Sequence, residues 1–132
     1  MEDIPKPVRN RGLQRLLKAF SYSWDGIRSA IACEEAFRQE LWGMVIVLPA
    51  SCLLPHLPLH FRLELVVAAL LLLVVELLNS ALEATVDKAS PEIHPLAKRA
   101  KDMGSAAVLF TVFINLVFWG GAIWMAFGGD KA

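Results

Sequence analysis

The stretch LELVVAALLLLVVELLNSALEATV, residues 63–86, decides the fold, because it is long and apolar enough to cross a bilayer as one helix. Its second half contains two acids and an amide: Glu76, Asn79 and Glu83. Their spacing places all three side chains on one face of a helix. A helix rises about 1.5 Å per residue, so Glu83 lies roughly 10 Å along the axis from Glu76. An acid at membrane depth is costly, and this face is therefore a candidate functional site.

The rest of the chain is also strongly apolar. It has 132 residues, of which 56% are hydrophobic, and its mean hydropathy is +0.50. Both values are higher than those of an ordinary soluble domain of this size. We therefore expect one all-α integral membrane domain covering residues 1–132. No nucleic-acid partner is expected.

Two further apolar stretches are expected to cross the membrane. Residues 103–127 begin MGSAAVLFTVFINLVF and are long enough to span with some tilt. The stretch LWGMVIVLPASCLL, residues 41–54, is too short alone, so we expect its helix to begin near Glu34 and to kink at Pro49. The predicted transmembrane helices are thus 34–54, 63–86 and 103–127.

Residues 11–31 have a different pattern, with apolar and polar side chains on opposite sides of one helix. This pattern is typical of an amphipathic helix on a membrane surface. A helix on a soluble core shows the same pattern, but a chain this apolar offers no soluble core. The apolar stripe contains Leu13, Leu16, Leu17, Phe20, Trp24, Ile27 and Ile31, and the polar side contains Arg11, Arg15, Lys18, Tyr22 and Asp25.

The basic residues predict the orientation of the chain. All lysines and arginines except Arg62 and Lys131 lie in residues 1–40 or 87–102. Both segments should therefore be cytoplasmic. With three spans, the C-terminus would lie on the opposite side of the membrane, outside the cytoplasm.

The segment between the second and third spans contains two prolines, Pro91 and Pro95. We expect the preceding helix to end near Ser90. A new helix should begin near His94, because proline suits the first turn of a helix.

Acidic residues at the cytoplasmic boundary are candidate metal ligands. Magnesium usually takes one or two protein carboxylates together with phosphate oxygens, which fits Glu34 and Glu83. A structural salt bridge is the alternative role for these two residues. Lys101 could bind nucleotide phosphates as a point charge. Glu76 lies deeper, where it could act as a general base toward an interfacial hydroxyl.

Other polar residues also have structural interpretations. Lys88, Lys101 and Arg38 can anchor helix ends at the headgroups. Asn79 can hydrogen-bond across helices, a common use of amides in membranes. The sequence contains neither G-x-x-x-x-G-K-[ST] nor G-x-G-x-x-G, so any use of ATP requires a site of another kind.

Four strings closely resemble the bacterial integral-membrane diacylglycerol kinases. They are GLQRLLKAFSYSWDGIRSA at 12–30, EEAFRQE at 34–40, VELLNSALEATVDK at 75–88 and AKRAKDMGSAAVL at 97–109, and the resemblance extends over almost the whole chain. The resemblance implies a homotrimer of three-span subunits, each with an N-terminal surface helix. It also implies interfacial active sites, shared between subunits, that transfer the γ-phosphoryl group of MgATP to diacylglycerol and yield phosphatidic acid.

The resemblance also implies roles for individual residues. Glu76 matches the catalytic base, and Glu34 and Glu83 match the metal-binding carboxylates. Polar residues around the transferred phosphate are matched by Asn79, Lys101 and Asp102. The implied ATP contacts are Arg15, Tyr22, Glu34, Glu83, Glu92, His94, Lys101 and Asp102. The implied lipid-substrate residues are Ser23, Trp24, Arg38, Gln39, Glu40, Trp42, Glu76 and Ser105.

The chain departs from the family pattern at five positions: Phe20, Glu35, Leu41, Pro95 and Lys98. Glu35, beside Glu34, leaves open which of the two carboxylates would bind the metal. Phe20 and Leu41 would narrow or reshape the lipid entrance, and Pro95 and Lys98 alter the loop near the expected nucleotide contacts.

Two other functions are compatible with parts of the pattern. One is phosphorylation of undecaprenol, an activity of related proteins, although the EAFRQE string and the surface helix favour diacylglycerol. The other is a non-enzymatic membrane subunit or small transporter in which Glu76 relays protons. A proton relay does not explain Asn79 and Glu83 on the same face, nor Lys101 and Asp102 at the boundary.

Overall fold

The computed structural model describes residues 12–90, 92 and 94–128, and these residues form helices joined by short connections. No strand occurs within these ranges, so the all-α prediction is confirmed. Arg11 of the predicted surface helix and Pro91 of the predicted loop lie outside the described residues. The helices are α1 (Leu13–Cys33), α2 (Glu35–Ser51), α3 (Leu59–Ala89) and α4 (Pro95–Ile123), which continues into a π-helical turn, η1 (Trp124–Gly128).

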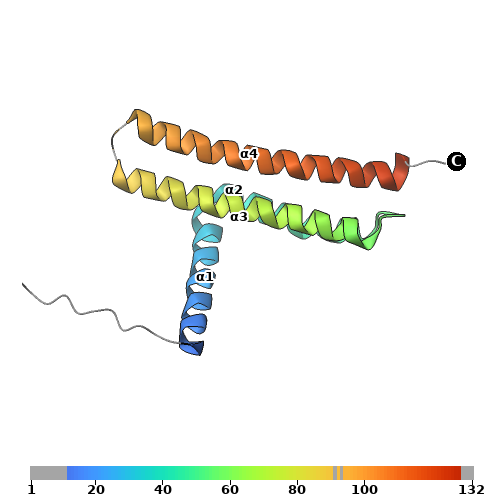
Figure 1. Ribbon diagram of the computed structural model, residues 1–132, viewed down its shortest axis with the longest axis horizontal. Helices are drawn as coiled ribbons and strands as arrows, with labels where there is room; N and C mark the ends of the chain where they lie inside the picture. Colours follow the sequence, from blue (N-terminus) through green and yellow to red (C-terminus); the bar gives the residue numbers. More distant parts are fainter. Residues whose placement is uncertain (1–11, 91, 93, 129–132) are drawn as a thin grey trace, which may run out of the picture.

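Three of the helices run alongside one another, and the fourth projects from them. Figure 1 shows α2, α3 and α4 along the long axis of the molecule, while α1 points away from this bundle. Helix α3 is in contact with both α2 and α4. Helix α1 joins the bundle only at its C-terminal end, where Ala30 is its one buried residue. Most of α1 is therefore free to contact something other than its own chain.

Within the described residues, two helices are long and apolar enough to cross a membrane: α3, and α4 with its π-helical turn. Helix α2 has 17 residues, against the predicted span of 34–54. At about 1.5 Å per residue it covers roughly 25 Å, slightly less than the hydrocarbon core of about 30 Å. Pro49 lies inside α2, near its end.

The connection between α3 and α4 has the predicted boundaries. Ser90 is the C-terminal cap of α3. His94 is the N-terminal cap of α4, and its Nδ1 accepts a hydrogen bond from the backbone N–H of Leu96 at 3.2 Å. Pro95 occupies the first helical position, where its missing N–H costs nothing. The predictions for Ser90, His94 and Pro95 are confirmed.

The buried apolar core is small and divided between the two ends of the bundle. One cluster has Ala30, Phe37 and Leu73 at its centre. The other has Leu57, Leu65 and Ala122 at its centre. Phe61 and Phe118 pack against this cluster, and the centroids of their two rings are 6.1 Å apart. Many large apolar side chains on α1, α3 and α4 are exposed on the single chain. Such surfaces require lipid or further protein around them.

Arg62 holds the connection between α2 and α3 together. Its Nη2 donates to Leu54 O at 2.9 Å, its Nε donates to Leu57 O at 3.2 Å, and its Nη1 donates to Ser51 O. Ser51 is the last residue of α2, and its carbonyl also accepts a hydrogen bond from the backbone N–H of Leu54 at 3.3 Å, while Leu54 and Leu57 lie in the turn that follows. A single guanidinium therefore bonds three backbone acceptors at the end of α2 and in the turn.

Replacing Arg62 with glutamine is expected to lower the free energy of unfolding by about 2 kcal/mol, because several charge-assisted hydrogen bonds are lost. Thermal unfolding in detergent measures this change. Arg99→Gln is the matched control, because Arg99 is exposed and makes no ion pair or side-chain hydrogen bond within residues 12–90, 92 and 94–128. Equal stability of the two variants would show that the hydrogen bonds of Arg62 do not stabilise the connection between α2 and α3.

Candidate functional site

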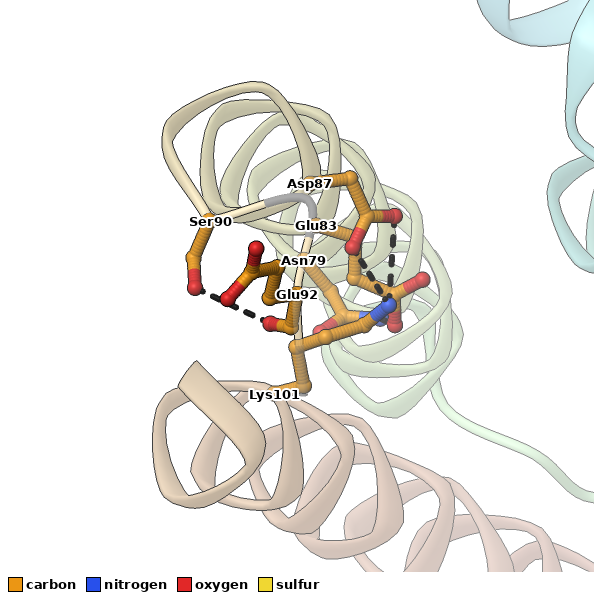
Figure 2. Close-up of polar contacts among 6 residues, drawn as sticks. All are labelled: Asn79, Glu83, Asp87, Ser90, Glu92 and Lys101. Carbon is orange, nitrogen blue, oxygen red and sulfur yellow. Dashed lines mark hydrogen bonds and ion pairs between the residues drawn. The ribbon is translucent and has the colours of Figure 1, made fainter. Parts of the chain in front are cut away.

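The polar face of α3 forms a line of side chains toward its C-terminal end. Asn79 Nδ2 donates to Glu83 Oε1 at 3.1 Å, so these two residues share the face that their spacing predicted. One helical turn beyond Glu83 lies Asp87, which faces α4. Figure 2 shows Asn79, Glu83 and Asp87 following one another, with Lys101 reaching them from α4.

Glu76 continues this line into the apolar part of the bundle. Only 5% of its surface is exposed, which is unusual for an acid. Its carboxylate lies close enough to Glu34, Glu40 and Glu83 to interact electrostatically with each of them. The site thus collects four acidic residues from α2, α3 and the α1–α2 junction.

These four acids lack basic partners within the described chain. Among residues 12–90, 92 and 94–128, none of them forms an ion pair with lysine, arginine or histidine. The salt-bridge alternative for Glu34 and Glu83 therefore finds no support there. The described part of the chain also contains no group of three His, Cys, Asp or Glu side chains arranged around one metal position. Two carboxylates plus phosphate oxygens are nevertheless sufficient for magnesium.

Glu34 occupies the break between α1 and α2. Its backbone is extended, with φ −103° and ψ 112°, so the helix direction changes there. Arg38 Nη1 stabilises the break by donating to Ile31 O at 3.0 Å and Ala32 O at 3.2 Å. Arg38 therefore caps the end of α1 through backbone carbonyls, a contact different from the predicted one with lipid headgroups.

A cleft of about 520 Å³ lies between α1 and α3, with Glu34 on its wall. Ser23 lines the same cleft, and small residues form much of the remaining wall. Glu35, in contrast, accepts a hydrogen bond from Gln39 Nε2 at 3.2 Å on an exposed side of α2. Of the two adjacent acids, Glu34 is thus the one that faces the cleft and interacts with Glu76.

A second cavity, of about 340 Å³, lies between the end of α3 and the start of α4. Lys101 Nζ bonds both carboxylate oxygens of Asp87, at 3.0 and 3.2 Å. This hydrogen bond and the nearby negative charges hold the pKa of Lys101 above its usual value. The acidic and basic residues on the cavity wall are Asp87, Glu92, His94, Lys98, Lys101 and Asp102.

Lys101 and Asp102 are adjacent in the sequence, but they do not pair with each other. Lys101 pairs with Asp87 across the two helices, while Asp102 pairs with Lys98 at 2.6 Å along α4. The reason is helical geometry, because neighbours in sequence point in different directions and residues four apart share a face. At Glu92, the backbone carbonyl accepts a hydrogen bond from Ser90 Oγ at 3.1 Å (Figure 2).

Several residues implied by the resemblance do not reach these two cavities within one chain. Glu40 lines a separate apolar groove of about 350 Å³ between α2, α3 and α4, and its Oε2 is buried without a hydrogen-bond partner in the described part of the chain. Trp24 stacks against Arg28, whose guanidinium carbon lies 5.3 Å from the ring centroid. Four residues are at least partly exposed and line neither cavity: Arg15, Tyr22, Trp42 and Ser105.

Two residues near the site were missed by the sequence analysis. Asn115 Nδ2 donates to Ala68 O at 2.9 Å, which links α4 to α3 inside the apolar region. Gly104 lies against Asn79, with no room for a side chain between them. An asparagine within the third apolar stretch was a usable signal for the first contact. The sequence contained no signal for the second, which depends on how α3 and α4 are aligned.

Comparison with known proteins places these features in a family. A family profile described as prokaryotic diacylglycerol kinase matches residues 21–123. A diacylglycerol kinase from Escherichia coli K12 is 42% identical over 117 residues, which cover 89% of this chain and 95% of the relative. Relatives with the same name occur in Pseudomonas aeruginosa, 45% identical over 87% of this chain and 94% of the relative, and in Helicobacter pylori J99, 42% identical over 90% and 89%.

Proposed function

Because the chain belongs to the prokaryotic diacylglycerol kinase family, we propose that it transfers the γ-phosphoryl group of ATP to the hydroxyl of diacylglycerol. The products are phosphatidic acid and ADP. The reaction takes place at the cytoplasmic surface of a bacterial inner membrane, where a lipid alcohol and a soluble nucleotide meet.

The polar face of α3 is the observation that carries this proposal. A buried acid, Glu76, is followed by the bonded pair Asn79–Glu83 and then by the ion pair Asp87–Lys101. The groups that suit a lipid hydroxyl, a nucleotide-bound cation and a phosphate therefore succeed one another toward the end of the helix. The cavity beside Lys101 gives the nucleotide a place at that end.

Each group has one part in the transfer. The Glu76 carboxylate accepts the proton of the lipid hydroxyl, and the hydroxyl oxygen attacks the γ-phosphorus. The bond from the γ-phosphorus to the bridging oxygen breaks, and ADP leaves. Lys101 neutralises negative charge on the phosphates, and positioning accounts for most of the remaining catalysis. Glu34 and Glu83 would hold magnesium, which supplies further charge neutralisation on the phosphate oxygens when bound.

We also propose that α2, α3 and α4 all span the membrane and that α1 lies on its cytoplasmic surface in a homotrimer. The exposed apolar faces of α3 and α4 and the exposed apolar stripe of α1 support this arrangement. Arg15 and Tyr22 line neither of the two cavities of their own chain. A site shared between subunits would give them a nucleotide to contact. With three spans, the C-terminus lies on the periplasmic side.

The experiment that tests the function is a kinase assay with purified protein in lipid, MgATP and a panel of lipid alcohols. We expect labelled γ-phosphate to appear in phosphatidic acid. Faster labelling of undecaprenol than of diacylglycerol would favour that substrate instead. No phosphorylated lipid from any alcohol would contradict the proposed function.

Glu34→Gln is expected to raise the magnesium concentration needed for half-maximal activity by at least about 10-fold, because a metal carboxylate is lost. Magnesium titration of the kinase rate measures the shift. Glu35→Gln removes the same charge one residue away, where the carboxylate bonds Gln39 instead, and should leave the titration unchanged. The opposite order of effects would assign the metal to Glu35.

A further inference from the structure

Of the helical glycines, Gly104 has the least room for a side chain. It lies on α4, where that helix packs against α3. A Cβ placed on Gly104 would overlap Asn79 Oδ1 and would meet Leu82 Cδ2 at 3.0 Å. At Gly26, Gly43 and Gly120 the same construction meets nothing within 4 Å. The absence of a side chain at position 104 is therefore what leaves room for the Asn79 carboxamide.

The Asn79 carboxamide is held by little else. Its Nδ2 donates to Glu83 Oε1 at 3.1 Å, and its Oδ1 is buried without a hydrogen-bond donor within the described part of the chain. A Cβ at Gly104 would press directly on that oxygen. The end of a side chain rotates more easily than two packed helices separate, so the amide would turn and its bond to Glu83 would break.

We propose that Gly104 is a positioning residue that acts on Glu83 through Asn79. Because Gly104 has no side chain, the Asn79 amide can stay oriented toward Glu83. The hydrogen bond from Asn79 Nδ2 to Glu83 Oε1 then fixes the Glu83 carboxylate. Hydrogen bonds to a ligating carboxylate from a neighbouring group tune metal affinity in the same way. This inference rests on the proposed function, in which Glu83 holds the nucleotide-bound magnesium.

Gly104→Ala is expected to lower kcat/KM for MgATP by about 10- to 100-fold and to raise the magnesium requirement, the usual cost of losing such a supporting contact. Gly120→Ala is the matched control, because it makes the same change in the same helix in open space. Both substitutions favour the helix equally by propensity. The control should therefore retain the activity of the unmodified protein.

A double-mutant cycle separates positioning from a general loss of packing. If Gly104 acts through Asn79, Gly104→Ala should have little further effect on kcat/KM in an Asn79→Ser background. An equal fold-loss in both backgrounds would overturn the proposal, because the alanine would then act independently of the amide.

The side-chain amide resonance of Asn79 provides a test that requires no activity. It can be identified by its absence in Asn79→Ser, and we expect it to shift in Gly104→Ala but not in Gly120→Ala. An unshifted resonance in Gly104→Ala overturns the proposal even if the protein phosphorylates no lipid. Conversely, an active protein with no effect of Gly104→Ala overturns the proposal and leaves the proposed function intact.

Discussion

Glu76→Gln is expected to lower the rate of lipid phosphorylation by about 10²- to 10⁴-fold, the usual contribution of a general base. Glutamine has nearly the same shape but cannot accept the hydroxyl proton. The fold should survive, because Glu76 has no basic partner within the described residues and glutamine fills nearly the same space, so no ion pair and little packing are lost. Steady-state kinetics with diacylglycerol and MgATP measure the rate, and thermal unfolding checks the fold.

Glu64→Gln is the control for this prediction. It removes an acid from the same helix, but Glu64 is exposed and lies nearer the start of α3, away from the polar face. Its kinase rate should equal that of the unmodified protein. If Glu76→Gln kept substantial activity, Glu76 would not be the base.

Lys101→Gln should have the second largest effect, lowering kcat by about 10²- to 10³-fold as expected for losing a group that stabilises transition-state charge. The KM for MgATP should also rise, because Lys101 would hold the phosphates before transfer as well as during it. Lys101→Arg keeps the charge and should keep more activity than glutamine. Initial rates over a range of MgATP concentrations measure both constants.

Lys88→Gln is the matched control, because Lys88 lies near the end of α3 but does not line the cavity beside Lys101. Its only expected role is contact with headgroups. Equal losses in Lys88→Gln and Lys101→Gln would show that general positive charge at the membrane surface matters, with no special place for Lys101.

Local patterns predicted the parts of this molecule that depend on one helix at a time. The spacing of Asn79 and Glu83 placed them on one face, where they are hydrogen-bonded. His94 and Pro95 predicted the start of α4, because both act within a single turn. Of the amphipathic pattern, residues 13–31 fall on α1, whose apolar stripe is exposed on the single chain.

Contacts between elements could not be predicted in the same way. Lys101 pairs with Asp87, 14 residues earlier, because the alignment of α3 and α4 brings them together. The same alignment places Gly104 against Asn79 and Asn115 against Ala68 O. Arg62 bonds carbonyls of a turn whose path no spacing specifies. Each of these contacts depends on how the elements pack together, and the periodicity of the sequence does not specify that packing.

Binding of a non-hydrolysable MgATP analogue to Glu76→Gln and Glu83→Gln in lipid tests most directly whether the two acids have separate roles. We predict that Glu76→Gln binds the analogue as tightly as the unmodified protein, although with ATP it phosphorylates lipid about 10²- to 10⁴-fold more slowly, because its role concerns the lipid hydroxyl. Glu83→Gln should bind the analogue more weakly, because its role concerns the nucleotide-bound cation. Loss of binding in Glu76→Gln, or unchanged binding in Glu83→Gln, would contradict this division of roles along α3.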